Sequence, residues 1–128
     1  MPETTLVFFQ ESDGNCPALK WLQELRKTNH KAYAKCAVRI KRLSEMGHEL
    51  RRPEADYLRD GIHELRARLG SVNYRILYFF HGRTSVILSH GFTKESEIPP
   101  AEIEKAVSRN SKYFSNPESH TYNDETTP

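Results

Sequence analysis

The sequence of 128 residues contains no long hydrophobic run. Its longest apolar stretch is Ile76–Phe80, whereas a helix that spans a bilayer needs about 20 apolar residues. The N-terminus carries Pro2 and Glu3 where a signal peptide would carry lysine or arginine, and only the short apolar run Leu6–Phe9 follows. We therefore expect a cytoplasmic protein without a membrane partner.

Cysteine is scarce as well, because only Cys16 and Cys36 are present. At most one disulfide could form, and two free thiols are expected in a reducing cytosol. The sequence has no Cys/His spacing typical of zinc sites, no acidic cluster for magnesium, no GxSxG or HExxH motif and no phosphate-binding glycine loop. It therefore indicates neither a metal nor a cofactor, and it disfavours a metal-dependent nuclease.

The formal net charge of +2 conceals a strong asymmetry along the chain. Residues 20–83 hold fifteen Lys and Arg against seven Asp and Glu, whereas the remaining residues hold four against ten. Such a basic region is typical of proteins that bind polyanions, although solvated helix faces explain it equally well. The middle of the chain is a candidate nucleic-acid surface.

The length suits one domain with one hydrophobic core. Turn signals and hydrophobic periodicity predict its first half. The expected elements are a strand over residues 4–10, a helix beginning at Pro17, and a second helix that Thr28 and Asn29 cap, ending at Met46 before Gly47.

The second half is predicted to contain a three-stranded antiparallel meander and a last helix. Residues 51–61 read as a polar connection, and the chain after the last helix reads as a disordered tail. The expected elements are strands over residues 62–69, 72–80 and 84–92, a helix opened by Pro99 and Pro100, and a tail over residues 115–128. The predicted fold class is α+β, with the first strand and a two-helix hairpin packed on an antiparallel sheet.

Basic residues recur at unusual places in the predicted meander. Alternation puts Glu64, Arg66 and Arg68 on one face of the strand over residues 62–69. Arg75 interrupts an apolar run, where a guanidinium must reach solvent, a carboxylate or a ligand. One explanation is a structural ion pair with Glu64 across the sheet. The other is that Arg66, Arg68, Arg75 and Lys94 converge on a phosphate-sized site, where arginine forks stabilise a phosphorane-like transition state.

Histidines are the remaining acid–base candidates, because they titrate near neutral pH. His63, His81 and His90 lie in or next to the predicted strands, and Glu64 could also exchange a proton. His90 alternates with Val86 and Leu88, so a buried structural role is at least as strongly indicated as a catalytic one.

The second predicted helix carries a basic face that continues into the following connection. These side chains are candidate contacts to the phosphates of RNA. The candidate RNA-binding residues are Lys35, Arg39, Arg42, Arg51 and Arg52.

Three segments of the second half form an ordered pattern, namely Leu58–Arg66 (LRDGIHELR), Tyr74–Phe80 (YRILYFF) and His90–Lys94 (HGFTK), followed by Pro99 and Ala106. This pattern resembles the phage-associated HigB-like branch of the RelE/ParE toxin superfamily. The resemblance covers about residues 4–112, and the order and spacing of the three segments make it specific.

The resemblance implies a RelE-like toxin domain over residues 1–114 and the function of a type II toxin. RelE/HigB members cleave mRNA on the ribosome, typically without metal, and thereby inhibit translation. A helix-turn-helix antitoxin similar to HigA neutralises the toxin, and the complex binds operator DNA through the antitoxin. The positions of Arg66, Arg68, Arg75 and Lys94 resemble those where such toxins hold and polarise the scissile phosphate. The RNA 2′-hydroxyl attacks that phosphate, so a base, a phosphate clamp and a proton donor suffice.

Two departures from the pattern bear on activity. Members of the branch commonly have a second lysine and a threonine where this chain has Glu95 and Ser96, and an aromatic residue where it has His63. These departures predict weaker cleavage or a different substrate. Two other functions therefore stay open, a ParE-like gyrase inhibitor and a degenerate toxin that only binds its antitoxin. The basic cluster favours the ribonuclease, and Glu95 favours the binding module.

Overall fold

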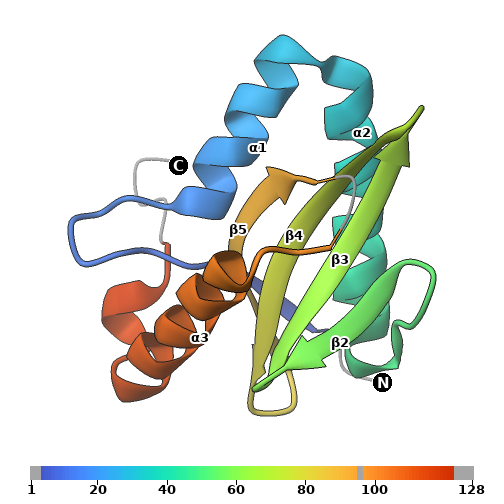
Figure 1. Cartoon of the computed structure of the whole chain (residues 1–128). Coiled ribbons are helices and arrows are strands. Elements are labelled where there is room, and N and C mark those ends of the chain that lie inside the picture. Colours follow the sequence, from blue (N-terminus) through green and yellow to red (C-terminus); the bar gives the residue numbers. More distant parts are fainter. Residues whose placement is uncertain (1–3, 95–96, 123–128) are drawn as a thin grey trace.

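The computed structural model describes residues 4–94 and 97–122, and it confirms the α+β class, with three α-helices in the described residues (Figure 1). The prediction of an antiparallel sheet with the first strand packed on it was wrong, because the first strand joins the sheet in parallel and makes it a mixed sheet of five strands. The predictions that concern Glu95 and Ser96 lie outside the described residues. The elements in chain order are β1 (Thr5–Phe8), α1 (Pro17–Thr28), α2 (His30–Met46), the 3₁₀ helix η1 (Gly47–Glu49), β2 (Ala55–Arg59), β3 (Ile62–Leu69), β4 (Val72–His81), β5 (Ser85–Thr93), α3 (Pro100–Ser115) and the 3₁₀ helix η2 (Glu118–His120).

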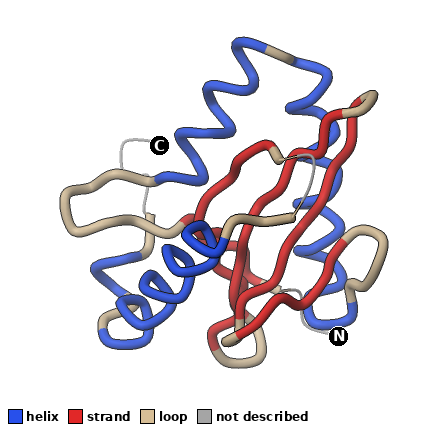
Figure 2. The backbone as a smooth tube through the Cα atoms, in the orientation of Figure 1, coloured by secondary structure: helices blue, strands red, loops and turns tan. Residues whose placement is uncertain are grey.

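The strands lie in the order β1-β5-β4-β3-β2. Strand β1 runs parallel to β5, and the other neighbours are antiparallel. Helices α1 and α2 cover one face of the sheet, and α3 covers the other (Figure 2). The sheet therefore separates two hydrophobic layers. Within the described residues, no helix combines the length and the apolarity that crossing a bilayer requires.

The predicted helix boundaries at the N-terminal hairpin are confirmed. Pro17 occupies the first turn of α1, where its missing N–H leaves no bond unmade. The side chain of Asn29 accepts a hydrogen bond from the backbone N–H of Ala32 (3.1 Å) and so caps α2. Gly47 ends α2 with a φ of 54°, a conformation that costs glycine little.

Each face of the sheet buries its own apolar cluster. On the α1–α2 face, Leu22, Cys36 and Leu43 belong to the same buried cluster as Leu65 and Ile76 of the sheet. Burial raises the pKa of the Cys36 thiol to about 12, and neither cysteine forms a disulfide. The cluster on the α3 face contains the buried residues Val7, Phe9, Ile62, Leu77, Phe79, Ile87, Ala106 and Tyr113.

The prediction of a plain connection over residues 51–61 was wrong, because this segment contains β2. Asp56 pairs with Glu64, and Tyr57 pairs with His63, in antiparallel register. Strand β2 lies at the edge of the sheet, and Tyr57 is exposed. Edge strands carry polar residues on their solvent side, so this strand lacks the apolar run that marks the others.

The expectation of a disordered tail does not hold for residues 116–122. His120 is buried and stacks on Phe9 with ring centroids 5.1 Å apart. Thr121 forms a β-bridge to Phe9, and the N–H of Tyr122 donates to the carbonyl of Phe8 (3.0 Å). This packing comes from isolated aromatic residues in an otherwise polar segment. Such residues show no hydrophobic periodicity, so the sequence pattern did not reveal them.

We expect Gly91→Ala to lower the free energy of unfolding by about 1–3 kcal/mol, the usual cost of overpacking. A Cβ atom at Gly91 would overlap the indole ring of Trp21, which lies against this strand. Urea denaturation measures the loss, with Thr93→Ala, at an exposed position of the same strand, as the control. A loss no greater than that of Thr93→Ala would contradict the close packing of Trp21 on β5.

Candidate functional site

Two arginines on the α3 face of the sheet share one buried carboxylate. Arg66 on β3 lies directly across from Arg75 on β4. Glu64 is only 2% exposed and forms ion pairs with both, through Arg66 Nη2 (3.0 Å) and through Arg75 Nη1. The Arg66 side chain is 39% exposed, whereas that of Arg75 is 8% exposed. The structure therefore confirms the ion pair with Glu64 and leaves Arg66 as the accessible guanidinium.

Lys94 and Arg68 relate differently to this Glu64–Arg66–Arg75 cluster. The Nε–H of Arg75 donates to the backbone carbonyl of Lys94 (2.9 Å), so the chain after β5 is tied to the cluster while Lys94 itself is exposed. The Nε–H of Arg68 donates instead to the carbonyl of Gly70 (2.9 Å) at the β3–β4 turn. Convergence of all four cations was therefore too broad a prediction, because Arg68 is directed to the hairpin.

His90 faces the opposite side of the sheet from the one that simple alternation predicted. Leu88 pairs with Tyr78 but His90 pairs with Leu77, so Ser89 is an extra residue that shifts the register. This bulge turns His90 toward α3, away from Val86 and Leu88. A one-residue bulge leaves no mark in the hydrophobic pattern, which explains the error.

Hydrogen bonds fix His90 in one neutral form. Its Nδ1 lies 3.0 Å from Nη1 of Arg109 and 2.8 Å from Oγ of Ser89, and its Nε2 lies 3.0 Å from Oε1 of Glu102. Arginine can only donate, so Nδ1 accepts and Nε2–H donates to Glu102. Burial, aided by the charge of Arg109, lowers the pKa of His90 to about 4. A structural role accounts for this histidine.

The other histidines lie away from the Glu64–Arg66–Arg75 cluster. His63 is on the α1–α2 face and stacks on Tyr78, with ring centroids 5.2 Å apart. Burial and the neighbouring His48 lower the pKa of His63. His81 contacts the rings of Tyr113 and, on the same helix, Phe114. His63 is therefore not placed to act on a phosphate held at Arg66.

Three of the predicted RNA-binding residues form ion pairs with carboxylates that follow α2 in the chain. Arg42 binds Glu54 with two hydrogen bonds (2.9 and 3.0 Å), and Arg39 lies 3.3 Å from the same carboxylate. The hydrogen bonds from Arg42 lower the pKa of Glu54. Arg52 forms an ion pair with Asp56 (2.9 Å). Lys35 and Arg51 are exposed, and no hydrogen bond or ion pair joins either side chain to the described residues.

The family model of phage-derived protein Gp49-like (DUF891) matches residues 23–111, which is more than half of the chain. The chain belongs to the Gp49-like family. This family is RelE toxin-like, in agreement with the resemblance of the three sequence segments. No curated protein matches the chain.

The Gp49-like match includes the Glu64–Arg66–Arg75 cluster, Lys94 and His90, and it leaves out β1 and the segment after α3. The part outside the match still contributes to the network of His90, because Arg109 also binds Glu11 near the N-terminus (3.0 Å). Sequence reasoning missed Glu11, Glu102 and Arg109, since partners so far apart in the chain give no local signal. It also missed His48, which follows α2 as an isolated histidine.

We expect the Gp49-like protein to lose stability as the pH falls from 7 toward 4. The unfolded chain protonates His90 near its ordinary pKa of 6.5, whereas the folded protein protonates it only near 4. The unfolded state therefore binds more protons in this interval, and His90 contributes a slope of up to about 1.4 kcal/mol per pH unit. Urea denaturation at several pH values measures the slope. A His90→Gln variant with the same pH dependence as the wild type would contradict this assignment.

Proposed function

We propose that this Gp49-like protein is the toxin of a type II toxin–antitoxin pair, an endoribonuclease of the HigB-like branch that cleaves mRNA without a metal ion. The observation that carries the proposal is the pair of arginines, Arg66 and Arg75, held side by side on one face of the sheet. The buried Arg75 and Glu64 fix the position of Arg66, whose exposed guanidinium can bind a phosphate through its remaining N–H groups. The exposed Lys94 at the end of β5 adds a second cation.

The same geometry supports a reaction that depends on charge stabilisation and positioning. Glu64 is occupied by two guanidinium groups, and His90 is buried with a low pKa, so neither is well suited to exchange a proton with substrate. In the proposed step the 2′-hydroxyl attacks the phosphate and displaces the 5′-oxygen, which leaves a 2′,3′-cyclic phosphate, while water accepts the hydroxyl proton and protonates the leaving oxygen. The rate then depends on orientation of the RNA and on stabilisation of the negative charge by Arg66 and Lys94. An mRNA held in place by the ribosome meets this requirement, so we propose ribosome-bound mRNA as the substrate.

The proposed partner is a HigA-like helix-turn-helix antitoxin that carries an acidic segment. Exposed cations favour such a partner, because complementary charge speeds association. Lys35 on α2 and Arg51 after η1 are exposed cations, and Arg66 and Lys94 are cations at the sheet. DNA would be bound only through the antitoxin in the complex.

One observation favours a second candidate function, the binding module without catalysis. The carboxylate of Glu64 forms ion pairs with both Arg66 and Arg75. Its negative charge partly neutralises the two guanidinium groups, so they stabilise a phosphate less strongly.

Induction in bacteria distinguishes these functions. The structure recommends Arg66→Ala/Lys94→Ala as the inactive variant, since both side chains are accessible, in place of changes at the buried Arg75. The double variant Lys20→Ala/Lys27→Ala removes two exposed cations of α1 and is the control. Growth arrest with new mRNA 5′ ends in the wild type and the control alone supports the ribonuclease. Arrest with intact mRNA would favour a gyrase inhibitor, and no arrest would favour the binding module.

A further inference from the structure

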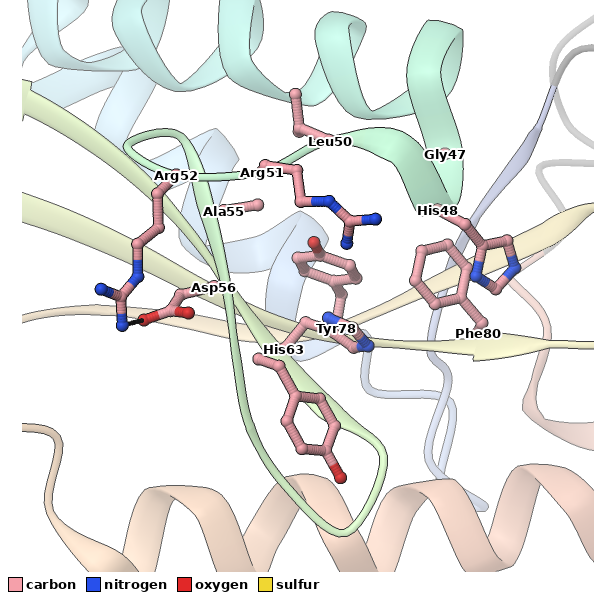
Figure 3. Close-up of a pocket in the computed structure, with 11 residues that line it drawn as sticks. Gly47, His48, Leu50, Arg51, Arg52, Ala55, Asp56, His63, Tyr78 and Phe80 are labelled. Carbon is pink, nitrogen blue, oxygen red and sulfur yellow. Dashed lines mark hydrogen bonds and ion pairs between the residues drawn. The ribbon is translucent and has the colours of Figure 1, made fainter.

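A cavity of about 350 Å³ opens on the α1–α2 face of the sheet, beside η1 and the edge strand β2 (Figure 3). This volume lies in the range of small-molecule sites. Five of the eleven lining residues carry rings, and the proposed cleavage site on the α3 face does not use them. The rings belong to His48, Tyr57, His63, Tyr78 and Phe80.

Four of these rings form two stacked pairs in the wall of the cavity. His48 stacks on Phe80, with centroids 3.7 Å apart and an angle of 20° between the planes. His63 stacks on Tyr78 at 5.2 Å and 18°, and it meets Phe80 edge to face. Burial and His48 lower the pKa of His63, which favours the neutral ring. Flat, mostly neutral rings of this kind are surfaces on which a nucleobase stacks.

Two polar groups reach the cavity without a partner in the described residues. Arg51 lines it from the segment after η1, and Figure 3 shows its guanidinium directed into the space above Tyr78. The hydroxyl of Tyr78 makes no hydrogen bond to the described residues. Among these residues, every fully buried side-chain N or O atom has a hydrogen-bond partner, so this hydroxyl cannot be fully buried. It is therefore open to the cavity, and burial raises the pKa of Tyr78, so the hydroxyl stays a donor.

The charge at the cavity suits an anion. Arg51 and Arg52 both line it, and the one carboxylate in its wall, Asp56, is bound to Arg52. A ring-lined space with a guanidinium that forms no ion pair with the described residues matches a ligand that joins an aromatic base to a phosphate. We propose that the cavity binds one nucleotide of single-stranded RNA, with its base against the rings and its phosphate at Arg51.

The position of the cavity links nucleotide binding to the proposed cleavage of RNA. The role of the cavity in the reaction rests on that proposed function. Asp56 on β2 is the register partner of Glu64 on β3. The hydrogen bond from Arg52 lowers the pKa of Asp56, and the charge of Arg66 contributes to the same shift. Arg52 therefore lines the cavity and also lies within electrostatic reach of Arg66 on the other face of the sheet. An RNA chain held in the cavity would cross β2 to reach the cleavage site.

The test is the binding of adenosine 5′-monophosphate, followed by the NMR signals of the histidine rings. We expect the signals of His48 and His63 to shift on titration. Arg51→Ala should weaken binding at least tenfold, and adenosine or inorganic phosphate alone should bind more weakly than the nucleotide. Arg83→Ala removes an exposed arginine from the β4–β5 turn and should leave the affinity unchanged. Arg51 is exposed, so its loss is not expected to unfold the protein.

Several results would overturn the proposal. They are an affinity that Arg51→Ala and Arg83→Ala change equally, an absence of shifts at His48 and His63, and an equal affinity for phosphate alone. The binding assay needs no cleavage, so the two proposals fail separately. A protein that cleaves mRNA but binds no nucleotide in the cavity refutes only this inference, whereas binding without cleavage refutes only the ribonuclease.

Discussion

Arg75→Met is expected to lower the free energy of unfolding by about 3–5 kcal/mol, the usual effect of removing one partner from a buried ion pair. Glu64 is 2% exposed and, among the described residues, would keep Arg66 alone as its ion-pair partner, whose side chain is 39% exposed. The bond from Arg75 to the carbonyl of Lys94 would also be lost. Domains are stable by only about 5–15 kcal/mol, so the variant should lie close to the limit of folding.

A second substitution separates the ion pair from the packing of the arginine stem. Glu64→Gln combined with Arg75→Met removes both charges, so the double variant should be more stable than Arg75→Met alone. Urea denaturation of both single variants and the double variant gives the coupling energy. Arg68→Met, which changes the exposed arginine at the β3–β4 turn, is the control and should stay within about 0.5 kcal/mol of the wild type. Equal losses for Arg75→Met and Arg68→Met would show that the buried pair does not stabilise the fold.

The sequence contained enough to predict most of the elements of this fold. Pro17, Asn29 and Gly47 are local signals for helix ends, and the strands over residues 62–69 and 72–81 have apolar residues at regular positions. The edge strand β2 was not predicted, because its residues include polar side chains on the solvent side and therefore form no apolar run. Residues 116–122 escaped prediction because their packing depends on isolated aromatic residues that meet β1 only in the folded chain.

The candidate site was predictable only in part, for a similar reason. Alternation correctly placed Glu64 and Arg66 on one face, and it identified the possible pair with Arg75. It failed at His90, since the bulge at Ser89 depends on pairing with β4. The cavity beside β2 was not predicted at all, because its rings come from segments that are brought together only by the sheet and by η1.

Arg66→Ala is expected to reduce the rate of RNA cleavage by about 10²–10³-fold, the usual effect of removing one group that stabilises transition-state charge. Arg66 is the accessible member of the Glu64–Arg66–Arg75 cluster, whereas Arg75 stays bound to the carboxylate. Arg66→Lys keeps the charge but loses the forked geometry, so its rate should lie between those of Arg66→Ala and the wild type. Cleavage of mRNA on purified ribosomes measures the rates, and urea denaturation shows whether the variants are folded.

The stability of the same variants decides how a loss of cleavage is interpreted. Because the Arg66 side chain is 39% exposed, Arg66→Ala should remain folded under the assay conditions, in contrast to Arg75→Met. Arg83→Ala, at an exposed position in the β4–β5 turn, should cleave like the wild type. A folded Arg66→Ala protein with full activity would move the reaction away from this cluster. Full activity in that variant, together with a loss in Arg51→Ala, would place the scissile phosphate at the cavity beside β2, since Arg51 lines this cavity and its side chain forms no ion pair within the part of the chain that the structure describes.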